Sequence, residues 1–512
     1  MWHLRRQAER IPLPQISLIT HALSRPSWLH PRVFRTEVLA GLVVALALIP
    51  EAISFSIIAG VDPRIGLFAS FTMAVSISIL GGRPAMISAA TGAIALVVAP
   101  LVASHGLRYL VAAVILGGIF QVVLGVLGVA SLMRFVPRSV MVGFVNALAI
   151  LIFMAQLPQL INVPGLVYPL VGAGLVIIYL APRVLTRLFG VVPPPLVAIV
   201  GITVVVATTG IRVPTVGDQG ALPDSLPTLL LPDVPYTFET LTIIAPFALA
   251  IALVGLLESL MTAKLVDDVT DTRSSKRRES WGQGAANIIT GFFGGMGGCA
   301  MIGQTMINVK SGARTRLSTF LAGVFLLILV VALGDIVGKI PMAALVAVMV
   351  MVSISTFDWH SIAPTTIRRL PKSEHAVMLA TVAVTVITSN LAYGVFVGVI
   401  VALMLFARRV AHLVNLTSEV SADAKTRTYK VTGELFFASS NDLYSQFDYA
   451  DLAEQIVIDL SGAHLWDAST IATLDAVTAK FERHHKRVTI VGLNIDSAER
   501  HERLTGHLGG AG

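Results

Sequence analysis

The sequence predicts a polytopic α-helical membrane protein, with fourteen transmembrane segments in a 7+7 inverted repeat and a small cytoplasmic α/β domain after them. Three observations lead to this prediction. Hydrophobic residues make up 55% of the 512 residues and charged residues only 13%, apolar stretches recur along the first 411 residues, and the composition turns polar after Arg409. Because soluble proteins average about 25% charged residues, most of this chain is expected to lie in a membrane.

The apolar stretches are each close to the roughly 20 residues that a helix needs to cross the hydrocarbon core. They are expected at 37–58, 64–80, 86–105, 108–132, 138–161, 166–182, 193–210, 243–264, 281–296, 299–309, 317–334, 340–355, 374–390 and 392–407. Segments 281–296 and 299–309 are short or rich in glycine. Their place in the count therefore depends on the charges of the loops.

Loop charges support the full count. If residues 1–35 lie inside, alternate loops such as 273–278 and 310–316 are rich in Lys and Arg, whereas the loops between them nearly lack both. Short cytoplasmic loops accumulate Lys and Arg, so both termini are predicted to be cytoplasmic. The net charge of +7 then reflects topology, and no nucleic-acid partner is expected.

Four domains follow from this reading: a cytoplasmic N-terminal arm at 1–35, a membrane domain at 36–411, a linker at 412–426 and a small domain at 427–512. In the last part, YKVTGELFF, QIVIDL and RVTIVGLN have the patterns of strands, and DASTIATLDAVTAKFERHH has helical spacing. Strands that alternate with helices indicate an α/β domain.

Two glycine-rich stretches stand at matching positions in the two halves. GGRPAMISAATGA, from Gly81, introduces the third span, and GGMGGCAMIGQTM, from Gly294, introduces the tenth. The first and eighth spans each carry one acid within their apolar run, Glu51 and Glu258. Because seven is odd, the second half must be inserted upside down relative to the first, which predicts an inverted repeat.

In transporters built on such repeats, paired interruptions of this kind point to the substrate site. Helix N-termini at the breaks would offer unpaired amides and about half a positive charge each to an anion. The alternative is that the glycines only allow close helix packing. The residues predicted to bind substrate are Ser88, Ala90, Thr91, Gly92, Ala300, Met301, Ile302, Gly303 and Phe55.

Glu258 is the favoured coupling residue. An acid inside a transmembrane helix costs at least about 2.5 kcal/mol and is usually functional. Thr262 lies four residues on, on the same helix face, and these oxygen atoms suit a hard cation such as sodium, whereas the carboxylate alone could take up a proton. Glu51 follows Pro50 and is a second candidate acid, unless its side chain only satisfies backbone groups that the proline frees. No metal-ligand cluster, nucleophile motif or phosphate loop is present, so no enzyme activity is expected.

Four segments resemble the SulP family of anion transporters with a C-terminal STAS domain: TEVLAGLVVALALIPEAISFSIIAG, GGRPAMISAATG, GLLESLMTAKLVDDVTDTRSSKRRESWGQGAANIITGFFGGMGG and VIDLSGAHLWDASTI. The spacing from Glu258 to Ile302 is most similar to that of cyanobacterial sodium-dependent bicarbonate transporters. The resemblance implies a homodimer in which a core domain (spans 1–4 and 8–11) moves like an elevator against a gate domain (spans 5–7 and 12–14). It also implies that Thr91 contacts substrate, and that Glu258, Thr262 and the backbone at Ala300, Met301 and Ile302 form a sodium site.

Three residues depart from the family pattern. Glu258 stands where the bicarbonate transporters have Asp, Gln304 where many anion exchangers have Arg, and Glu51 where many members have Gln. Without the arginine, no fixed positive side chain assists the anion, which favours cation-coupled symport over exchange.

In the STAS-like domain, Ser469 matches the serine that is phosphorylated in anti-sigma-factor antagonists. The alternative is that a Ser or Asp of the DAST sequence only caps a helix.

The preferred hypothesis is a secondary active transporter of bicarbonate or sulfate, driven by sodium or protons and without any other cofactor. It is expected to contact lipid in the plasma (inner) membrane of a bacterium-like cell. Two alternatives stay open: a nucleobase permease of the same fold, although those proteins lack a STAS domain, and a membrane-anchored signalling scaffold.

Overall fold

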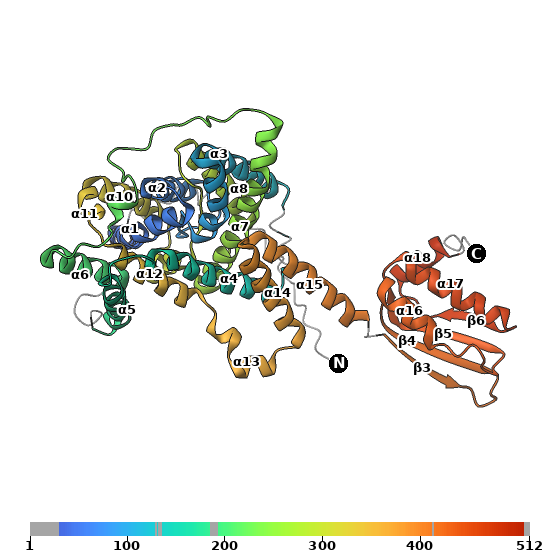
Figure 1. Cartoon of the computed structure of the whole chain (residues 1–512). Coiled ribbons are helices and arrows are strands. Elements are labelled where there is room, and N and C mark those ends of the chain that lie inside the picture. Colours follow the sequence, from blue (N-terminus) through green and yellow to red (C-terminus); the bar gives the residue numbers. More distant parts are fainter. Residues whose placement is uncertain (1–29, 129–130, 132–135, 185–192, 412–413, 506–512) are drawn as a thin grey trace, which may run out of the picture. The chain divides into compact units, whose positions relative to one another are not determined.

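The computed structural model describes residues 30–128, 131, 136–184, 193–411 and 414–505 (Figure 1). Most of the predicted arm at 1–35, and residues 412–413 of the predicted linker, lie outside these ranges. By length and composition, six of the described helices could cross a membrane: Pro31–Ala59, Pro63–Leu80, Gly92–Val126, Arg138–Leu160, Phe238–Thr270 and Leu391–Val410. Shorter apolar helices are Val167–Ala181, Pro194–Thr209, Leu317–Ala332 and Met342–Thr356.

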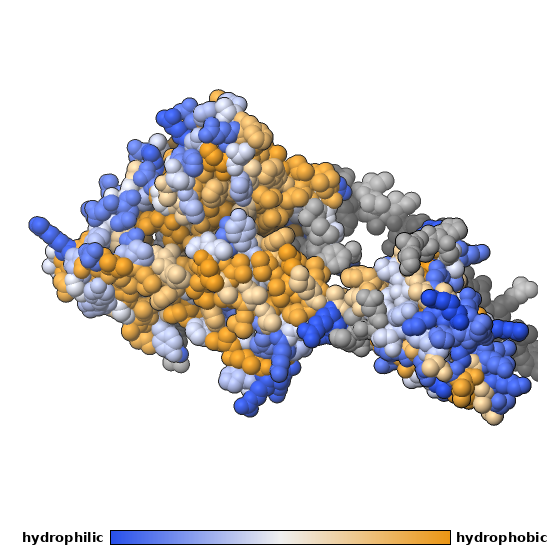
Figure 2. Space-filling model, turned by 45° about the vertical axis from the view of Figure 1, so that its right-hand side comes forward, coloured by the Kyte–Doolittle hydropathy of each residue, from blue (hydrophilic) through white to orange (hydrophobic). Residues whose placement is uncertain are grey.

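The chain divides into two compact units. One comprises residues 1–369 and 378–396, and the other comprises 370–377 and 397–512. Hydrophobic residues cover much of the visible surface of the helical unit, whereas hydrophilic residues dominate that of the α/β part (Figure 2). This contrast agrees with a membrane-embedded part and a part that faces water.

Long helices follow the predicted apolar segments closely. They are α1 (Pro31–Ala59), α2 (Pro63–Leu80), α3 (Gly92–Val126), α4 (Arg138–Gln156), α5 (Val167–Val184), α6 (Pro194–Thr209), α7 (Phe238–Thr270), α8 (Lys276–Phe292), α9 (Ile302–Lys310), α10 (Arg316–Ala332), α12 (Met342–Thr356), α14 (Lys372–Thr388) and α15 (Leu391–Ala411). Short helices α11 (Gly334–Gly338) and α13 (Pro364–Arg369) connect some of them.

One difference concerns the predicted spans 86–105 and 108–132. Both lie within α3, in which two helical segments meet at Gly106, a residue with non-helical backbone angles (φ 77°, ψ −174°), so the predicted division between them is present. Residues 86–91, predicted to begin the earlier span, are not helical, and α3 starts only at Gly92. Glycine tolerates this backbone angle because it has no Cβ atom, so a single residue separates the two helical segments.

The helices of the first unit pack in two groups. The core group consists of α1, α2, α3, α7, α8, α9 and α10, and the gate group consists of α4, α5, α6 and α12. Each helix packs mainly within its own group, and α1 and α3 also contact members of the gate group. The boundary between the groups therefore runs past α1 and the start of α3.

Two short strands meet inside the core group. β1 (Ser88–Ala89) pairs antiparallel with β2 (Cys299–Ala300), so that Ser88 lies opposite Ala300 and Ala89 opposite Cys299. Helix α3 begins three residues after β1, and α9 begins two residues after β2. Both glycine-rich stretches thus interrupt helical structure and lead into a new helix.

Glycines make the second interruption sterically feasible. Gly297 has a φ of 78°, a left-handed conformation that other residues rarely adopt. A Cβ atom on Gly298 would lie only 2.1 Å from the carbonyl oxygen of Ala89. The backbone of β2 can therefore approach β1 only because position 298 has no side chain.

Side chains from neighbouring helices satisfy the interrupted backbone. Asn287 of α8 bonds both the amide and the carbonyl of Gly298, at 2.9 and 3.0 Å. The hydroxyl of Ser259 on α7 accepts from the Ala300 amide at 3.1 Å, and that of Ser70 on α2 accepts from the Ala90 amide at 3.3 Å. Buried backbone groups without partners are costly, so these contacts allow non-helical chain at this depth.

Two buried carboxylates fix the ends of the core helices. Glu37 of α1 accepts the Arg314 and Thr315 amides through one oxygen, at 2.7 and 3.0 Å, and the Ser318 amide through the other, at 3.0 Å. Glu279 of α8 likewise accepts the Gly82 and Arg83 amides, at 2.7 and 3.0 Å. These charge-assisted bonds tie α1 to the start of α10, and α8 to the loop before β1.

The second unit contains a four-stranded sheet in the order β3-β4-β5-β6: β3 (Asn415–Val420), β4 (Thr426–Leu435), β5 (Gln455–Leu465) and β6 (Arg487–Val491). β3 is antiparallel to β4, and the other neighbours are parallel. Helices α16 (Phe437–Gln446), α17 (Ala468–Arg483) and α18 (Ile495–Leu504) follow β4, β5 and β6. Its core includes the fully buried Val431, Ile458, Leu474 and Phe481.

The structure corrects the expected linker, since β3 lies within 412–426. Its sequence NLTSEV is mostly exposed on both faces, so the apolar alternation that reveals a half-buried strand is missing. A polar strand at the edge of a sheet is a common protection against aggregation. Helices α16 and α18 were not predicted either.

We expect Gly298→Ala to destabilise the protein by about 1 to 3 kcal/mol, because the added methyl group overlaps backbone atoms of β1. Thermal unfolding of the purified protein in detergent measures the effect. Gly303→Ala is the matched control, because a Cβ atom there meets nothing within 4 Å. Equal melting temperatures for both variants would contradict the close approach of β1 and β2.

We expect Glu37→Gln to cost about 1.5 to 3 kcal/mol of stability, the range for hydrogen bonds to charged groups. Glu37 uses both oxygen atoms as acceptors, whereas glutamine would turn an NH2 group toward one set of amides. The same unfolding assay applies. Glu239→Gln, an exposed acid in the first turn of α7, should unfold like the wild type, and an unchanged midpoint for Glu37→Gln would refute the assignment.

Candidate anion-binding cavity

A cavity of about 390 Å³ lies where the core and gate groups meet. Its core side contains Glu51 and Phe55 of α1, Thr91 and Gly92 at the start of α3, Glu258 and Met261 of α7, and Met301, Ile302, Gly303, Gln304 and Ile307 at α9. Its gate side contains Phe144, Val145, Leu148, Ile152, Ile178, Pro194, Pro195, Val348, Met351, Val352, Ser355 and Thr356. The polar groups are therefore concentrated on one wall.

Two helix N-termini meet at this cavity. Thr91 is the N-cap of α3, and its hydroxyl accepts the Ile94 amide at 3.4 Å. Met301 is the N-cap of α9 and offers no side-chain cap. Amides of the first helical turn have no partner within their own helix, and both N-termini carry partial positive charge. The geometry therefore provides an anion-binding environment formed by backbone.

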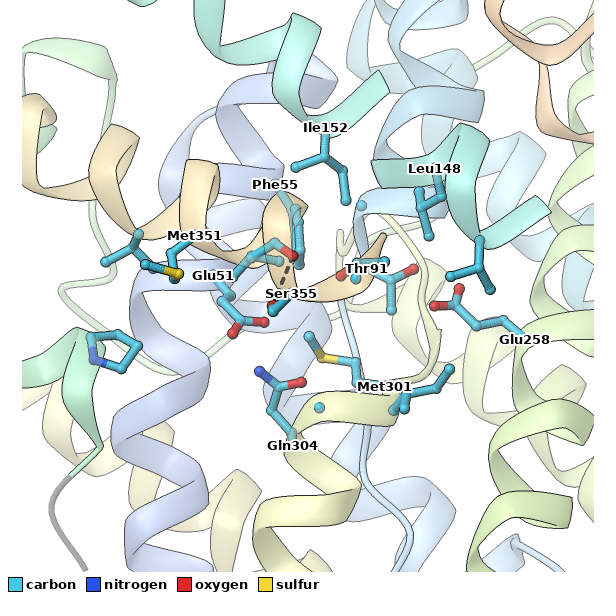
Figure 3. A pocket seen from close by; sticks show the side chains of 18 of the residues that line it. Glu51, Phe55, Thr91, Leu148, Ile152, Glu258, Met301, Gln304, Met351 and Ser355 are labelled. Atoms are coloured by element: carbon cyan, nitrogen blue, oxygen red, sulfur yellow. Dashed lines mark hydrogen bonds between the residues drawn. The ribbon is translucent and has the colours of Figure 1, made fainter. Parts of the chain in front are cut away.

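Glu258 lies at one side of the helix ends (Figure 3). The Cys299 thiol donates to its Oε2 atom at 2.9 Å, and the Thr91 hydroxyl lies 3.1 Å from the same sulfur atom. Glu258 is only 8% exposed. A short polar chain thus connects this carboxyl group, through the sole cysteine, with the cap of α3.

Glu51 lies on the other side, beyond Thr91 and Met301 as seen from Glu258 (Figure 3). It is 9% exposed, and the amide side chain of Gln304 lines the cavity beside it (Figure 3). Gln304 is the third residue of α9 and is 3% exposed. The acid in α1 and the first turn of α9 therefore face the same cavity.

Most of the residues predicted from the sequence line the cavity, namely Glu51, Phe55, Thr91, Gly92, Glu258, Met301, Ile302 and Gly303. Ser88, Ala90, Ala300 and Thr262 lie behind it. The Ser88 hydroxyl accepts from Gln283 at 2.5 Å, and the Thr262 hydroxyl donates to the Glu258 carbonyl at 2.8 Å. These residues support the cavity wall in the structure.

Sequence reasoning missed the gate wall. Its contributors from α4, α5, α6 and α12 are nearly all apolar residues within apolar helices, so no local signal separates them from lipid-facing neighbours. Gln304 drew notice only as a departure from a family pattern, although it lines the cavity beside Glu51. Only the packing of the two helix groups brings these residues together.

The charge balance of the cavity is unusual for an anion site. Among its described lining residues there are two acids and no Lys, Arg or His. The described part of the chain also contains no group of three or more His, Cys, Asp and Glu side chains able to hold a metal ion. Among the described lining groups, positive potential therefore comes from the N-termini of α3 and α9.

Outside the membrane part, the predicted site Ser469 is exposed at the second position of α17. Asp467 is the N-cap, and its Oδ1 atom accepts the Thr470 amide at 3.0 Å. The capping role that the sequence left open between Ser and Asp thus belongs to the aspartate.

Comparison with known proteins places the chain among anion transporters. The sequence pattern of the Sulfate permease family matches residues 34–169 and 161–381, and that of the STAS domain matches 417–507. The chain is 55% identical to the putative sulfate transporter YbaR of Bacillus subtilis over 460 residues, which cover 90% of this chain and 95% of the relative. It is 24% identical to the bicarbonate transporter BicA of Picosynechococcus sp., over 93% of this chain and 92% of the relative.

A solved structure shares the fold. The murine anion transporter Solute Carrier 26 family member A9, in an inward-facing state, aligns with a TM-score of 0.79 and 16% identity, over 97% of this chain and 92% of the other. The relatives are named as transporters and not as enzymes, as the sequence predicted. The chain belongs to the Sulfate permease family and ends in a STAS domain.

Proposed function

We propose that the protein is a secondary active transporter of a small inorganic oxyanion, bicarbonate or sulfate, coupled to sodium or protons. One observation carries the proposal: the N-termini of α3 and α9 meet in a cavity whose only charged lining side chains, among the described residues, are acids. The names of the relatives support the substrate class, since they include sulfate and bicarbonate transporters.

The anion would bind between the two helix starts. The amides at Gly92, Ile302 and Gly303 would donate to its oxygen atoms, with the Thr91 hydroxyl beside them. Such backbone donors fit planar bicarbonate and tetrahedral sulfate alike, so any discrimination between the two anions would come from the side chains around them.

The coupling cation would bind at Glu258. A carboxylate near the anion repels it unless a proton or a metal ion compensates the charge. The oxygen atoms on offer suit a hard cation such as sodium: the Glu258 carboxylate, and the Thr262 hydroxyl, whose lone pairs stay available while it donates its proton to a carbonyl. The backbone at Ala300, Met301 and Ile302 would complete the set.

We propose an elevator movement of the core group against the gate group. All the strongly polar groups of the cavity belong to the core group, and the opposite wall is largely apolar. Anion and cation would therefore travel with the core. The corresponding broken helices α3 and α9 also support the fourteen-span, 7+7 inverted repeat that the sequence predicts.

The assembly we propose is a homodimer in a bacterial plasma membrane, with both termini in the cytoplasm. The distribution of Lys and Arg among the loops supports this orientation. Ser469, exposed at the start of α17, would be accessible to a regulatory kinase in that compartment.

Uptake of labelled bicarbonate and labelled sulfate into proteoliposomes tests the function, with and without an inward sodium gradient and with and without a pH gradient. We expect cation-stimulated uptake of one or both anions. Glu258→Gln should lower the stimulated component at least tenfold, because a carboxylate and a cation about 4 Å apart attract each other by about 4 kcal/mol near a protein surface.

Glu239→Gln is the matched control, since it removes an exposed acid from the same helix and should transport like the wild type. Stimulated uptake that persists in Glu258→Gln would contradict the coupling role. No uptake of either anion by the wild type would contradict transport of these substrates and favour the signalling-scaffold alternative.

A further inference from the structure

The cavity holds one acid more than cation coupling at a single carboxylate requires. Glu258 has a role in the proposed function, but Glu51 lines the same cavity on the other side of the helix ends (Figure 3). Any anion that contacts the first turn of α9 therefore also comes near Glu51.

Gln304 makes both protonation states of Glu51 feasible. A carboxamide offers an NH2 donor and a carbonyl acceptor, so it can donate to an ionised carboxylate or accept from a protonated carboxyl group. The neighbouring side chains are both at least nine-tenths buried. Gln304 can therefore turn the matching group toward Glu51 when that carboxyl group gains or loses a proton.

An ionised carboxylate can only accept hydrogen bonds. Bicarbonate carries a hydroxyl group that can donate to it. Sulfate at neutral pH carries no proton, so beside an ionised Glu51 it meets like charge with no donor between the two oxygen atoms. Beside a protonated Glu51, in contrast, sulfate can accept a hydrogen bond.

Among the described lining residues, Glu258 is the other charged side chain. Because it is also an acid, it cannot offset the repulsion between sulfate and an ionised Glu51. The segments packed against α1 have their titratable groups away from the cavity lining: Arg64 at the start of α2, His105, Arg108 and Tyr109 in the second half of α3, Lys310 at the end of α9, and Arg316 at the start of α10. Helices α6 and α12 contribute no titratable group. Helix α1 itself has Arg32, Arg35 and Glu37 near its start. The Cys299 thiol donates its hydrogen bond to Glu258.

We propose that Glu51 and the bound anion together hold one proton, so that Glu51 selects anions by protonation state. A hydroxyl-bearing anion such as bicarbonate binds to the ionised carboxylate. A fully deprotonated dianion such as sulfate binds only after Glu51 has taken up a proton from solution. This inference rests on the proposed function, because it assumes that an oxyanion occupies the cavity.

Equilibrium binding of labelled sulfate and labelled bicarbonate to the purified full-length protein, at saturating sodium, tests the proposal. The dissociation constants are measured between pH 7.0 and 8.5 in closed vessels. They are calculated from the concentration of bicarbonate or sulfate ion present at each pH. In the wild type, sulfate affinity should fall with rising pH, by up to tenfold per pH unit because one proton is taken up with the anion. Bicarbonate affinity should not fall.

Glu51→Gln places a permanently neutral donor at this position. We expect it to bind sulfate with an affinity that no longer depends on pH, and to lose at least tenfold in its preference for bicarbonate at pH 8.5. Glu51→Asp retains a carboxyl group and should retain the pH dependence, which separates this role from a merely structural one. Glu239→Gln should match the wild type.

A sulfate affinity that does not change with pH in the wild type, or that keeps the same pH dependence in Glu51→Gln, would overturn the role of Glu51 while leaving anion binding intact. Absence of binding of either anion by the wild type at every pH would instead overturn the proposed function, and this inference with it.

Discussion

The architecture depends on one constraint: non-helical backbone inside a membrane must find hydrogen-bond partners within the protein. The pairing of β1 with β2 meets part of this demand, and Asn287, Ser259 and Ser70 meet more of it. Once these partners are fixed, α3 and α9 must begin at the same place. The anion-binding environment is therefore a consequence of how two interruptions satisfy each other.

The same constraint explains the buried carboxylates away from the cavity. Glu37 and Glu279 accept backbone amides at the turns that lead into α10 and β1. They keep the ends of the broken segments in position without any contribution to the cavity. The buried acids described above therefore form two groups, those that line the cavity and those that accept backbone amides at turns. A low charge content alone does not tell the two groups apart.

Hydropathy and loop charge predicted most helix positions because membrane helices are long and uniformly apolar. The break at 294–298 was predictable too, because its glycines are visible in the sequence. Gly297 is required by its left-handed backbone angle, and Gly298 by the close approach of β1. The interruption of α3 at Gly106 lies in the gap between the predicted spans 86–105 and 108–132, whereas the late start of α3 at Gly92 was not predicted. β3 was not predicted because a polar edge strand lacks the alternation of apolar and polar residues. The gate wall was not predicted because apolar residues that face the cavity look the same in the sequence as those that face lipid.

The one-sided lining of the cavity has a consequence for how the protein could diversify. The acids and the two helix N-termini of the cavity are on the core helices, whereas the free volume is bounded opposite them by residues such as Val348 and Ile152. Steric fit and charge recognition are therefore encoded on separate rigid groups. In the function that we propose, a substitution that enlarges or shrinks the gate wall would alter which anion fits while the helix ends and acids remain in place, so these two properties would be free to evolve independently.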